Sequence, residues 1–187
     1  MRSRRDVDGA MVMRLARVWA ARRDAIRAVA GAGAVAASGA WARGALASDP
    51  SVGVEGWPAV RLLDGETLRP EQLRGSAVVL VFWATYCPFC LRHNAHVDAL
   101  HRASAGRPLR VLTAALDRDP QTVRAYMRRN GYSFPVTLDA EPLRTALQLR
   151  RVIPLTCTFD RSGRPLQRIA GEMFEEDVVE LRRLADG

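Results

Sequence analysis

Apolar residues along this 187-residue chain fall into short continuous runs that alternate with longer, amphipathic stretches. The clearest run is 77–83, Ala-Val-Val-Leu-Val-Phe-Trp, which holds three valines and no polar residue. It begins after Gly75 and Ser76 and ends shortly before a pair of cysteines. Such a run is typical of a strand whose two faces are both buried. The pattern therefore predicts that 77–83 is a central strand of a sheet.

Other predicted elements surround this strand in the sequence. Strands are predicted by apolar or alternating runs at 59–63, 110–116, 134–138, 155–159 and 166–170. Helices are predicted by apolar residues at helical spacing at 88–105, 120–130, 142–149 and 174–185. The order is strand, helix, strand, helix, and then a hairpin and a closing helix. We therefore expect an α/β fold in which helices flank both faces of a central mixed β-sheet.

Basic residues are concentrated at the front of the chain. The sequence has 28 basic residues, all of them arginine, and a formal net charge of +8. Residues 1–47 hold nine arginines and three aspartates, a net charge of +6, whereas the remaining 140 residues hold 19 arginines and 17 acidic residues. The resulting +2 on that larger part is typical of an ordinary mixed surface. We therefore expect no nucleic-acid partner.

Residues 1–47 have the pattern of an export signal. Arg22 and Arg23 precede a weakly apolar stretch at 28–42, and the small-x-small sequence Ala-Leu-Ala at 45–47 follows it. A charged region, a short apolar region and such an ending make up a secretory signal. The apolar stretch is shorter than the roughly 20 residues that a membrane-spanning helix needs.

Two export routes are open. The paired arginines favour the twin-arginine route, but Ala21 and Ala25 depart from that motif, which leaves the general secretory route. An uncleaved signal would anchor the chain to the membrane. In each case we expect a periplasmic or otherwise exported protein, in a compartment that permits disulfides. Behind the signal we predict a flexible leader at 48–57 and one folded domain at 58–187.

The clearest chemistry lies in the sequence Cys87, Pro88, Phe89, Cys90, at the junction of a predicted strand and a predicted helix. A helix N-terminus presents free N–H groups and a positive partial charge to a thiolate. We therefore predict that Cys87 has a lowered pKa and is the attacking nucleophile. Pro88 suits the first helical turn, where its missing N–H is not needed. Cys90, one turn inside the helix, is the predicted resolving thiol, and Phe89 completes the active-site dipeptide.

This motif and two later segments resemble the thioredoxin superfamily, most closely its periplasmic TlpA/ResA-like thiol–disulfide oxidoreductases. The resemblance rests on 78–90, on 134–139, and on 152–160 together with Gly163. It covers about residues 55–185. It implies a thioredoxin-like fold and an enzyme that exchanges thiols and disulfides with protein substrates.

The resemblance also implies roles for individual residues and partners. Cys87 and Cys90 would form the redox-active disulfide, with no other cofactor. Pro154 would be the cis-proline that faces the cysteines, and Ile153 would offer main-chain hydrogen bonds to a substrate chain. Electrons would come from a membrane thiol transporter of the DsbD/CcdA kind, so that the protein reduces disulfides in protein substrates. Apocytochrome c and copper-site proteins are both open as substrates.

Three positions depart from the family pattern. Tyr86 replaces the usual Trp, and Val81 stands where thioredoxin has a buried aspartate that takes part in proton transfer. His93 stands where many TlpA-like members have Glu, on the same helix face as Cys90. A protonated His93 would lower the pKa of Cys90 and make the pair more oxidising. A surface histidine without a role is the alternative, so the direction of electron flow stays open.

Two other functions are compatible with the motif. A DsbA-like disulfide oxidase or isomerase also has Cys-Pro-x-Cys, but the 63 residues at 91–153 leave no room for the inserted helical domain of DsbA. A thioredoxin-like copper or zinc metallochaperone would use Cys87, Cys90 and His93. His96 extends these to a set of four potential metal ligands. Four ligands along one short helix cannot readily surround one ion. We therefore predict no metal site.

Cys157 is the third cysteine of the chain and stands apart from the Cys87–Cys90 pair. Cys157 lies in a predicted strand, where a free cysteine behaves as a small buried apolar residue. Its alternative role is an exposed third thiol that forms mixed disulfides. The peroxidase pattern P-x-x-x-[ST]-x-x-C is absent, because Leu80 and Ala84 occupy its Pro and Ser/Thr positions before Cys87.

Overall fold

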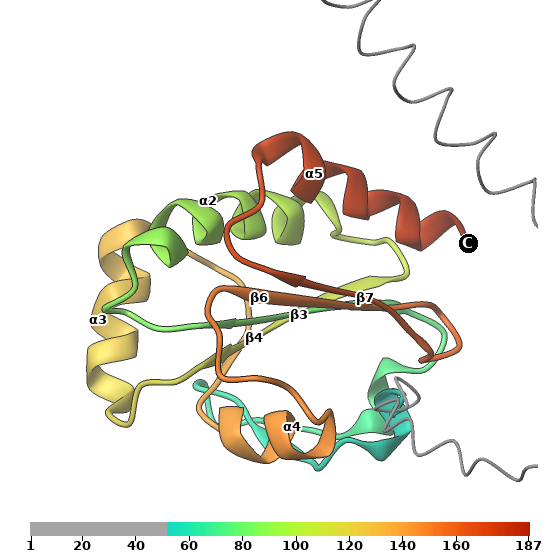
Figure 1. Ribbon diagram of the computed structural model, residues 1–187, viewed down its shortest axis with the longest axis horizontal. Helices are drawn as coiled ribbons and strands as arrows, with labels where there is room; N and C mark the ends of the chain where they lie inside the picture. The colour runs from blue at the N-terminus through green and yellow to red at the C-terminus, as the bar shows by residue number, and fades with distance from the viewer. Residues whose placement is uncertain (1–51) are drawn as a thin grey trace, which may run out of the picture. The chain divides into compact units, whose positions relative to one another are not determined.

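A five-stranded mixed sheet forms the centre of the protein, whose computed structural model describes residues 52–187. Its strands are β3 (Ala77–Trp83), β4 (Leu109–Ala115), β5 (Val136–Thr137), β6 (Leu155–Phe159) and β7 (Pro165–Ala170). Their order across the sheet is β5-β4-β3-β6-β7 (Figure 1). β3, β4 and β5 run parallel, whereas β6 runs antiparallel to both β3 and β7. The predicted export signal at 1–47 lies outside the described residues.

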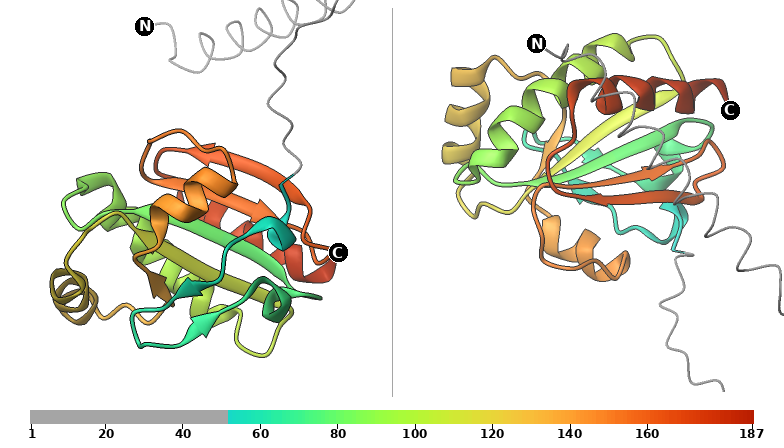
Figure 2. Two further views of the ribbon diagram at one scale, coloured as in Figure 1. Left: turned by 90° about the horizontal axis from the view of Figure 1, so that it is seen from below. Right: turned by 45° about the horizontal axis from the view of Figure 1, so that its top comes forward.

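Helices cover both faces of this sheet, which confirms the predicted fold class. The helices are α2 (Pro88–Ala103), α3 (Pro120–Asn130), α4 (Ala140–Ala146) and α5 (Glu175–Glu180). The shorter elements are η1 (Val54–Gly56), β1 (Val60–Arg61), β2 (Thr67–Leu68), η2 (Pro70–Leu73) and η3 (Leu181–Asp186). α2 and α5 lie over one face, and α4 and the N-terminal β1–β2 hairpin lie over the other (Figures 1 and 2). None of the helices within 52–187 is long and apolar enough to span a bilayer.

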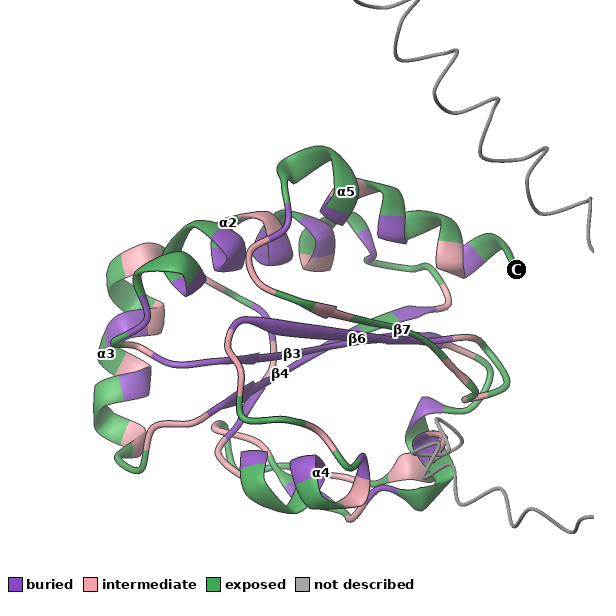
Figure 3. Ribbon diagram, viewed as in Figure 1, coloured by how far each residue is buried: buried purple, intermediate pink, exposed green. Residues whose placement is uncertain are grey.

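The central strand divides the core into two parts. All seven residues of β3 are buried (Figure 3). Because side chains alternate along a strand, Val79 and Val81 join the core under α2, α3 and α5, whereas Leu80 and Phe82 join the core under α4. A strand covered on both faces explains why its sequence has no polar position.

Several predicted elements have different ends in the structure. The predicted helix 142–149 is α4, which ends before Gln148 because Gln148 has a φ of +51°, in the left-handed region. The predicted helix 174–185 is α5 followed by the tighter turn η3. The predicted strands 59–63 and 134–138 contribute only two residues each to a ladder.

The flexible leader predicted at 48–57 is wrong for its last four residues. Val54 and Trp57 are buried. The N–H of Val54 donates to the carbonyl of Gly163 at 2.9 Å, and the ring of Trp57 meets Phe159 edge-on, with 5.1 Å between the ring centroids. These two apolar side chains bind the segment to the core, although glycines surround them in the sequence.

Candidate active site

The candidate site lies where β3 ends and the chain turns into α2. The side chain of Asp117, which follows β4, holds this turn. It accepts hydrogen bonds from the N–H of Thr85 at 3.0 Å and from its hydroxyl at 2.5 Å. Since β3 and β4 are parallel neighbours, the chain leaves both strands at the same edge of the sheet. Asp117 therefore holds the main chain of the segment between β3 and Cys87 in place. The sequence alone does not point to this residue.

Cys87 and Cys90 form a disulfide at the N-terminus of α2. Cys87 is the N-cap residue, and its Sγ accepts the main-chain N–H of Cys90 at 3.2 Å. Pro88 is the first residue of the helix, as predicted. Cys87 is 8% exposed and Cys90 is completely buried. A molecule that approaches the pair therefore meets Cys87 first, at the sulfur that the helix N-terminus faces.

Exposed aromatic side chains flank the cysteines. Tyr86 is 70% exposed and Phe89 is 56% exposed. The guanidinium of Arg92 lies over the ring of Phe89, 5.5 Å from its centroid. Glu172, which follows β7, accepts two hydrogen bonds from Arg92, at 2.6 Å from Nε and 2.5 Å from Nη2. These hydrogen bonds raise the pKa of Arg92 and lower that of Glu172, and they tie α2 to the loop before α5.

His93, one turn after Cys90, is buried and has partners on both ring nitrogens. The N–H of Met173 donates to Nδ1 at 3.3 Å, and Nε2 lies 3.1 Å from the hydroxyl oxygen of Thr156. Because Nδ1 accepts, the single proton of the neutral ring is on Nε2, which donates to Thr156. Burial and, to a smaller extent, the charge of His96 lower the pKa of His93 to about 4. The ring is therefore neutral at pH 7.

This arrangement corrects both interpretations of His93. The residue is not at the surface, and it does not carry the positive charge that would lower the pKa of Cys90. Both of its nitrogens are engaged, so it does not offer a free lone pair to a metal ion. Within 52–187, no three His, Cys, Asp or Glu side chains are placed to hold one metal ion.

Ile153 and Pro154 lie in the loop before β6. Because Leu155 at the start of β6 pairs with Phe82 near the end of β3, this loop lies at the end of the sheet where β3 leads to Cys87. The peptide bond between them is cis. The carbonyl of Pro154 accepts the N–H of Gly171 at 2.9 Å. Ile153 packs against the apolar cluster that contains both cysteines, and it lines a groove together with Tyr86 and Asp117. Ile153, one of the two predicted substrate-binding residues, thus lies beside Tyr86, the residue that precedes Cys87.

Cys157 is a buried free thiol in β6, as the sequence predicted. It stands opposite Leu80 of β3 in the ladder, and its side chain belongs to the core under α4. Burial raises the pKa of this thiol to about 11. The alternative of an exposed third thiol is therefore wrong.

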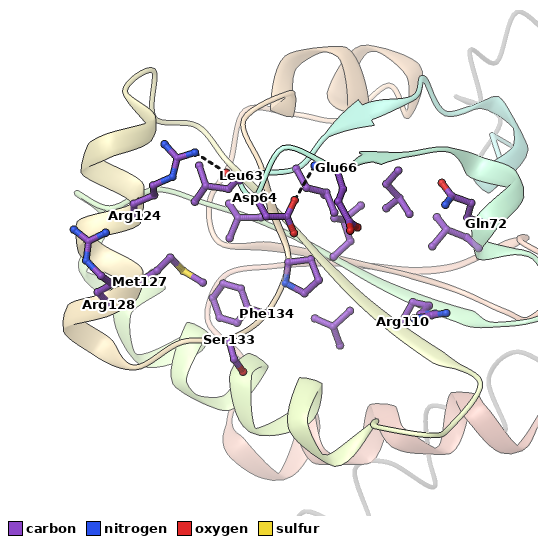
Figure 4. A pocket seen from close by; sticks show the side chains of 17 residues that line it. Leu63, Asp64, Glu66, Gln72, Arg110, Arg124, Met127, Arg128, Ser133 and Phe134 are labelled. Carbon is purple, nitrogen blue, oxygen red and sulfur yellow. Dashed lines mark hydrogen bonds between the residues drawn. The ribbon is translucent and has the colours of Figure 1, made fainter.

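A second pocket lies away from the cysteines, between the β1–β2 hairpin, α3 and β4 (Figure 4). Two of its charged side chains have local partners: Arg124 donates to the carbonyl of Leu63 at 2.6 Å, and Asp64 accepts the N–H of Glu66 at 3.0 Å. None of its lining residues, all of which lie within the described chain, belongs to the predicted site.

Known proteins with similar sequences share one activity in their names. The chain is 29% identical over 122 residues to the thiol-disulfide oxidoreductase ResA of Halalkalibacterium halodurans, covering 65% of this chain and 69% of that protein. It is 30% identical over 118 residues to ResA of Geobacillus kaustophilus, covering 62% of this chain and 67% of that protein.

Two solved structures have the same fold as this chain, and a protein-family model matches its sequence. A thiol:disulfide interchange protein from Chlorobium tepidum TLS superposes with a TM-score of 0.64 at 24% identity, covering 74% of this chain and 94% of that one. A secreted thiol-disulfide isomerase from Corynebacterium glutamicum superposes with a TM-score of 0.61 at 22% identity, covering 70% and 86%. Residues 57–160, more than half of the chain, match the AhpC/TSA family. The chain therefore belongs to the AhpC/TSA family, as a thioredoxin-like protein-disulfide oxidoreductase.

Proposed function

We propose that this protein is exported and that it reduces disulfides in protein substrates through Cys87 and Cys90. The observation that carries the proposal is the asymmetry of the pair. Cys87 is reachable and its Sγ accepts an N–H at the start of α2, whereas Cys90 is enclosed. A donor aimed at Sγ stabilises a thiolate there, which suits Cys87 to attack and Cys90 to resolve.

The reaction proceeds in two exchanges. The Cys87 thiolate attacks one sulfur of the substrate disulfide, forms a mixed disulfide and releases the other substrate sulfur as a thiolate. Cys90 then gives up its proton to solvent, and its thiolate attacks Sγ of Cys87 and releases the second substrate thiolate. Two electrons pass to the substrate, the two released thiolates take up two protons, and the Cys87–Cys90 disulfide remains. No other cofactor takes part.

The substrate chain lies in the groove between Tyr86 and Ile153 and pairs with the main chain of Ile153 beside Pro154. Tyr86 and Ile153 both line this groove, and the relatives are named for thiol–disulfide exchange, which supports a bound protein chain here. A membrane thiol transporter of the DsbD/CcdA kind returns two electrons to the disulfide.

Export is supported by the signal pattern at 1–47 and by a structural neighbour that is described as secreted. The N-terminal residue of the protein from fractionated cells tests it, and a mature chain that starts at Met1 in the cytoplasm would refute it.

The reduction of insulin by the protein with dithiothreitol tests the catalytic pair. We expect activity in the wild type, its loss in Cys87→Ser, and a trapped mixed disulfide in Cys90→Ser. Cys157→Ala is the matched control, because that thiol is buried outside the pair, and it should keep full activity. Full activity in Cys87→Ser would refute the proposal.

The reduction potential of the pair, measured against glutathione, decides the direction of electron flow. A value near that of thioredoxin, about −270 mV, or below supports a reductant. A value near that of DsbA, about −120 mV, would instead support a disulfide oxidase or isomerase. The Cys-Pro-x-Cys sequence and the isomerase among the structural neighbours favour that alternative.

Copper or zinc that survives dialysis in the wild type and is lost in Cys87→Ser would support a metallochaperone.

A further inference from the structure

Arg144 of α4 is a buried cation without an acidic partner. It is 3% exposed, and within 52–187 it takes part in none of the ion pairs. Removing a guanidinium from water is costly, and here no carboxylate of residues 52–187 lies within ion-pairing distance to compensate for the loss. The hydrogen bonds that Arg144 makes instead all lead to one stretch of main chain.

That stretch is the loop between α4 and β6. Nη1 of Arg144 donates to the carbonyl of Arg150 at 2.9 Å, and Nη2 donates to the carbonyl of Val152 at 3.2 Å. The main-chain carbonyl of Arg144 also accepts the N–H of Leu149 at 3.0 Å. The guanidinium lies over the ring of Phe82 in β3, 5.3 Å from its centroid. One side chain thus connects the strand that leads to Cys87 with the loop that leads to Pro154.

The bond to Val152 fixes the orientation of Ile153. The carbonyl of Val152 and the N–H of Ile153 belong to the same planar trans peptide group, in which they point in opposite directions. Because the carbonyl of Val152 points toward the buried guanidinium of Arg144, we infer that the N–H of Ile153 points away from it. No hydrogen bond within 52–187 uses this N–H. A donor to the carbonyl also polarises the peptide, which makes its N–H a better donor.

We propose that Arg144 is the positioning residue for polypeptide substrates: it holds the Val152–Ile153 peptide so that the N–H of Ile153 is presented to a substrate chain. The inference rests on the proposed function, in which the main chain of Ile153 pairs with the substrate. Arg144 touches neither sulfur, so it governs the binding of an extended chain and not the exchange of disulfides itself. A small disulfide that has no polypeptide chain does not need it.

Two substitutions test this role against substrates of two sizes. Arg144→Lys keeps a positive charge but cannot reach both carbonyls with one planar group. Arg144→Met removes the charge as well. Arg150→Met is the matched control, because it removes an exposed guanidinium from the same loop and leaves the carbonyl that Arg144 binds. For each variant, kcat and KM are measured with insulin, and the rate constant is measured with glutathione disulfide, together with the reduction potential.

We expect Arg144→Lys to raise KM for insulin about fivefold, the effect of weakening one hydrogen bond to the substrate. Its kcat, its reduction potential and its rate with glutathione disulfide should match those of the wild type and of Arg150→Met. Equal losses with both substrates would mean that Arg144 only supports the fold, and an unchanged KM would mean that it positions nothing. Both results overturn the inference. If Arg144→Met does not fold, Arg144→Lys alone decides. A wild type that fails to reduce insulin would refute the proposed function itself.

Discussion

A neutral, buried histidine makes the stability of this protein depend on pH. The pKa of His93 is about 4 in the folded protein and 6.5 in an ordinary environment. Between these pH values the unfolded chain binds a proton that the folded protein does not bind. The free energy of unfolding therefore falls as the pH drops from 6.5 to 4, and His93 adds no further loss below pH 4. The pKa difference corresponds to about 3 kcal/mol.

Urea unfolding at about pH 7, 5.5 and 4.5 measures this dependence. The comparison variant is His93→Gln, whose amide can accept the N–H of Met173 and donate to Thr156 but does not titrate. We expect the free energy of unfolding to change less with pH in the variant than in the wild type. Parallel profiles for the two proteins would contradict the assignment.

The three cysteines should differ in reactivity. With a pKa of about 11, Cys157 has roughly one thiolate per thousand molecules at pH 8, and its side chain is buried. In the reduced, folded protein we expect iodoacetamide to modify Cys87 and to leave Cys157 unmodified until urea is added. Mass spectrometry of the peptides identifies the modified residue. Alkylation of Cys157 at the rate of Cys87 would show that β6 opens in the native protein.

Functional residues could be predicted where they form a local sequence motif. Contacts between residues that lie far apart in the sequence could not be predicted. Cys87 and Cys90 stand out because a buried strand and a helix start enclose them. The environment of His93 depends on Thr156 and Met173, which are 63 and 80 residues away. Arg144 gave no signal, because it is one of 28 arginines and its partners are main-chain carbonyls. Contacts of this kind become visible only once the sheet brings the segments together.

At the level of the elements, α2 is fixed to the rest of the domain by a buried carboxylate. Asp98 accepts hydrogen bonds from the N–H and the hydroxyl of Ser133, at 2.6 and 3.0 Å, and forms an ion pair with Arg102 at 2.6 Å. Asp98 is 1% exposed, whereas the side chain of Arg102 is 61% exposed. The hydrogen bonds to the loop before β5 should therefore matter more for stability than the ion pair.

Two substitutions separate these contributions. We expect Asp98→Ala to lower the free energy of unfolding by about 1–3 kcal/mol, because the Ser133 donors lose their acceptor. Arg102→Met, which removes only the exposed partner of the ion pair, should lower it by less than about 1 kcal/mol. Urea unfolding provides both values. A larger loss in Arg102→Met than in Asp98→Ala would show that the ion pair, and not the loop contact, fixes α2.

The elements that could be predicted well are those whose burial is uniform along their length. β3 has the predicted bounds, because an unbroken apolar run cannot face water on either side. The end of α4 was predicted too late, because Gln148 takes a left-handed φ of +51° that few non-glycine residues adopt. The closing helix was predicted as one piece, because its apolar spacing also suits the short helix α5 and the turn η3.

Across the domain, the antiparallel pairing of β3 with β6 places the candidate site and residues 54–57 at opposite ends of the sheet. Val78, near the start of β3, pairs with Phe159, near the end of β6, whereas Cys87 follows the other end of β3. The turn after β6 holds Gly163, whose carbonyl accepts the N–H of Val54. Residues 54–57, the last part of the predicted leader, therefore lie at the end of the sheet opposite the cysteines. A substitution in residues 53–57 should therefore change the free energy of unfolding without changing the reduction potential of the Cys87–Cys90 pair.

Gly53→Ala tests this separation. A Cβ at Gly53 would lie 2.6 Å from the carbonyl oxygen of Gly163, a main-chain atom that cannot turn aside. The segment must shift, and we expect the free energy of unfolding to fall by about 1–3 kcal/mol. Gly56→Ala is the matched control, because its Cβ would meet only the side chain of Val52, which can rotate, and it should cost less. Since the strain arises a full strand length from Cys87, the reduction potential should equal that of the wild type in both variants. A potential that shifts in Gly53→Ala alone would show that the two ends of the sheet are coupled.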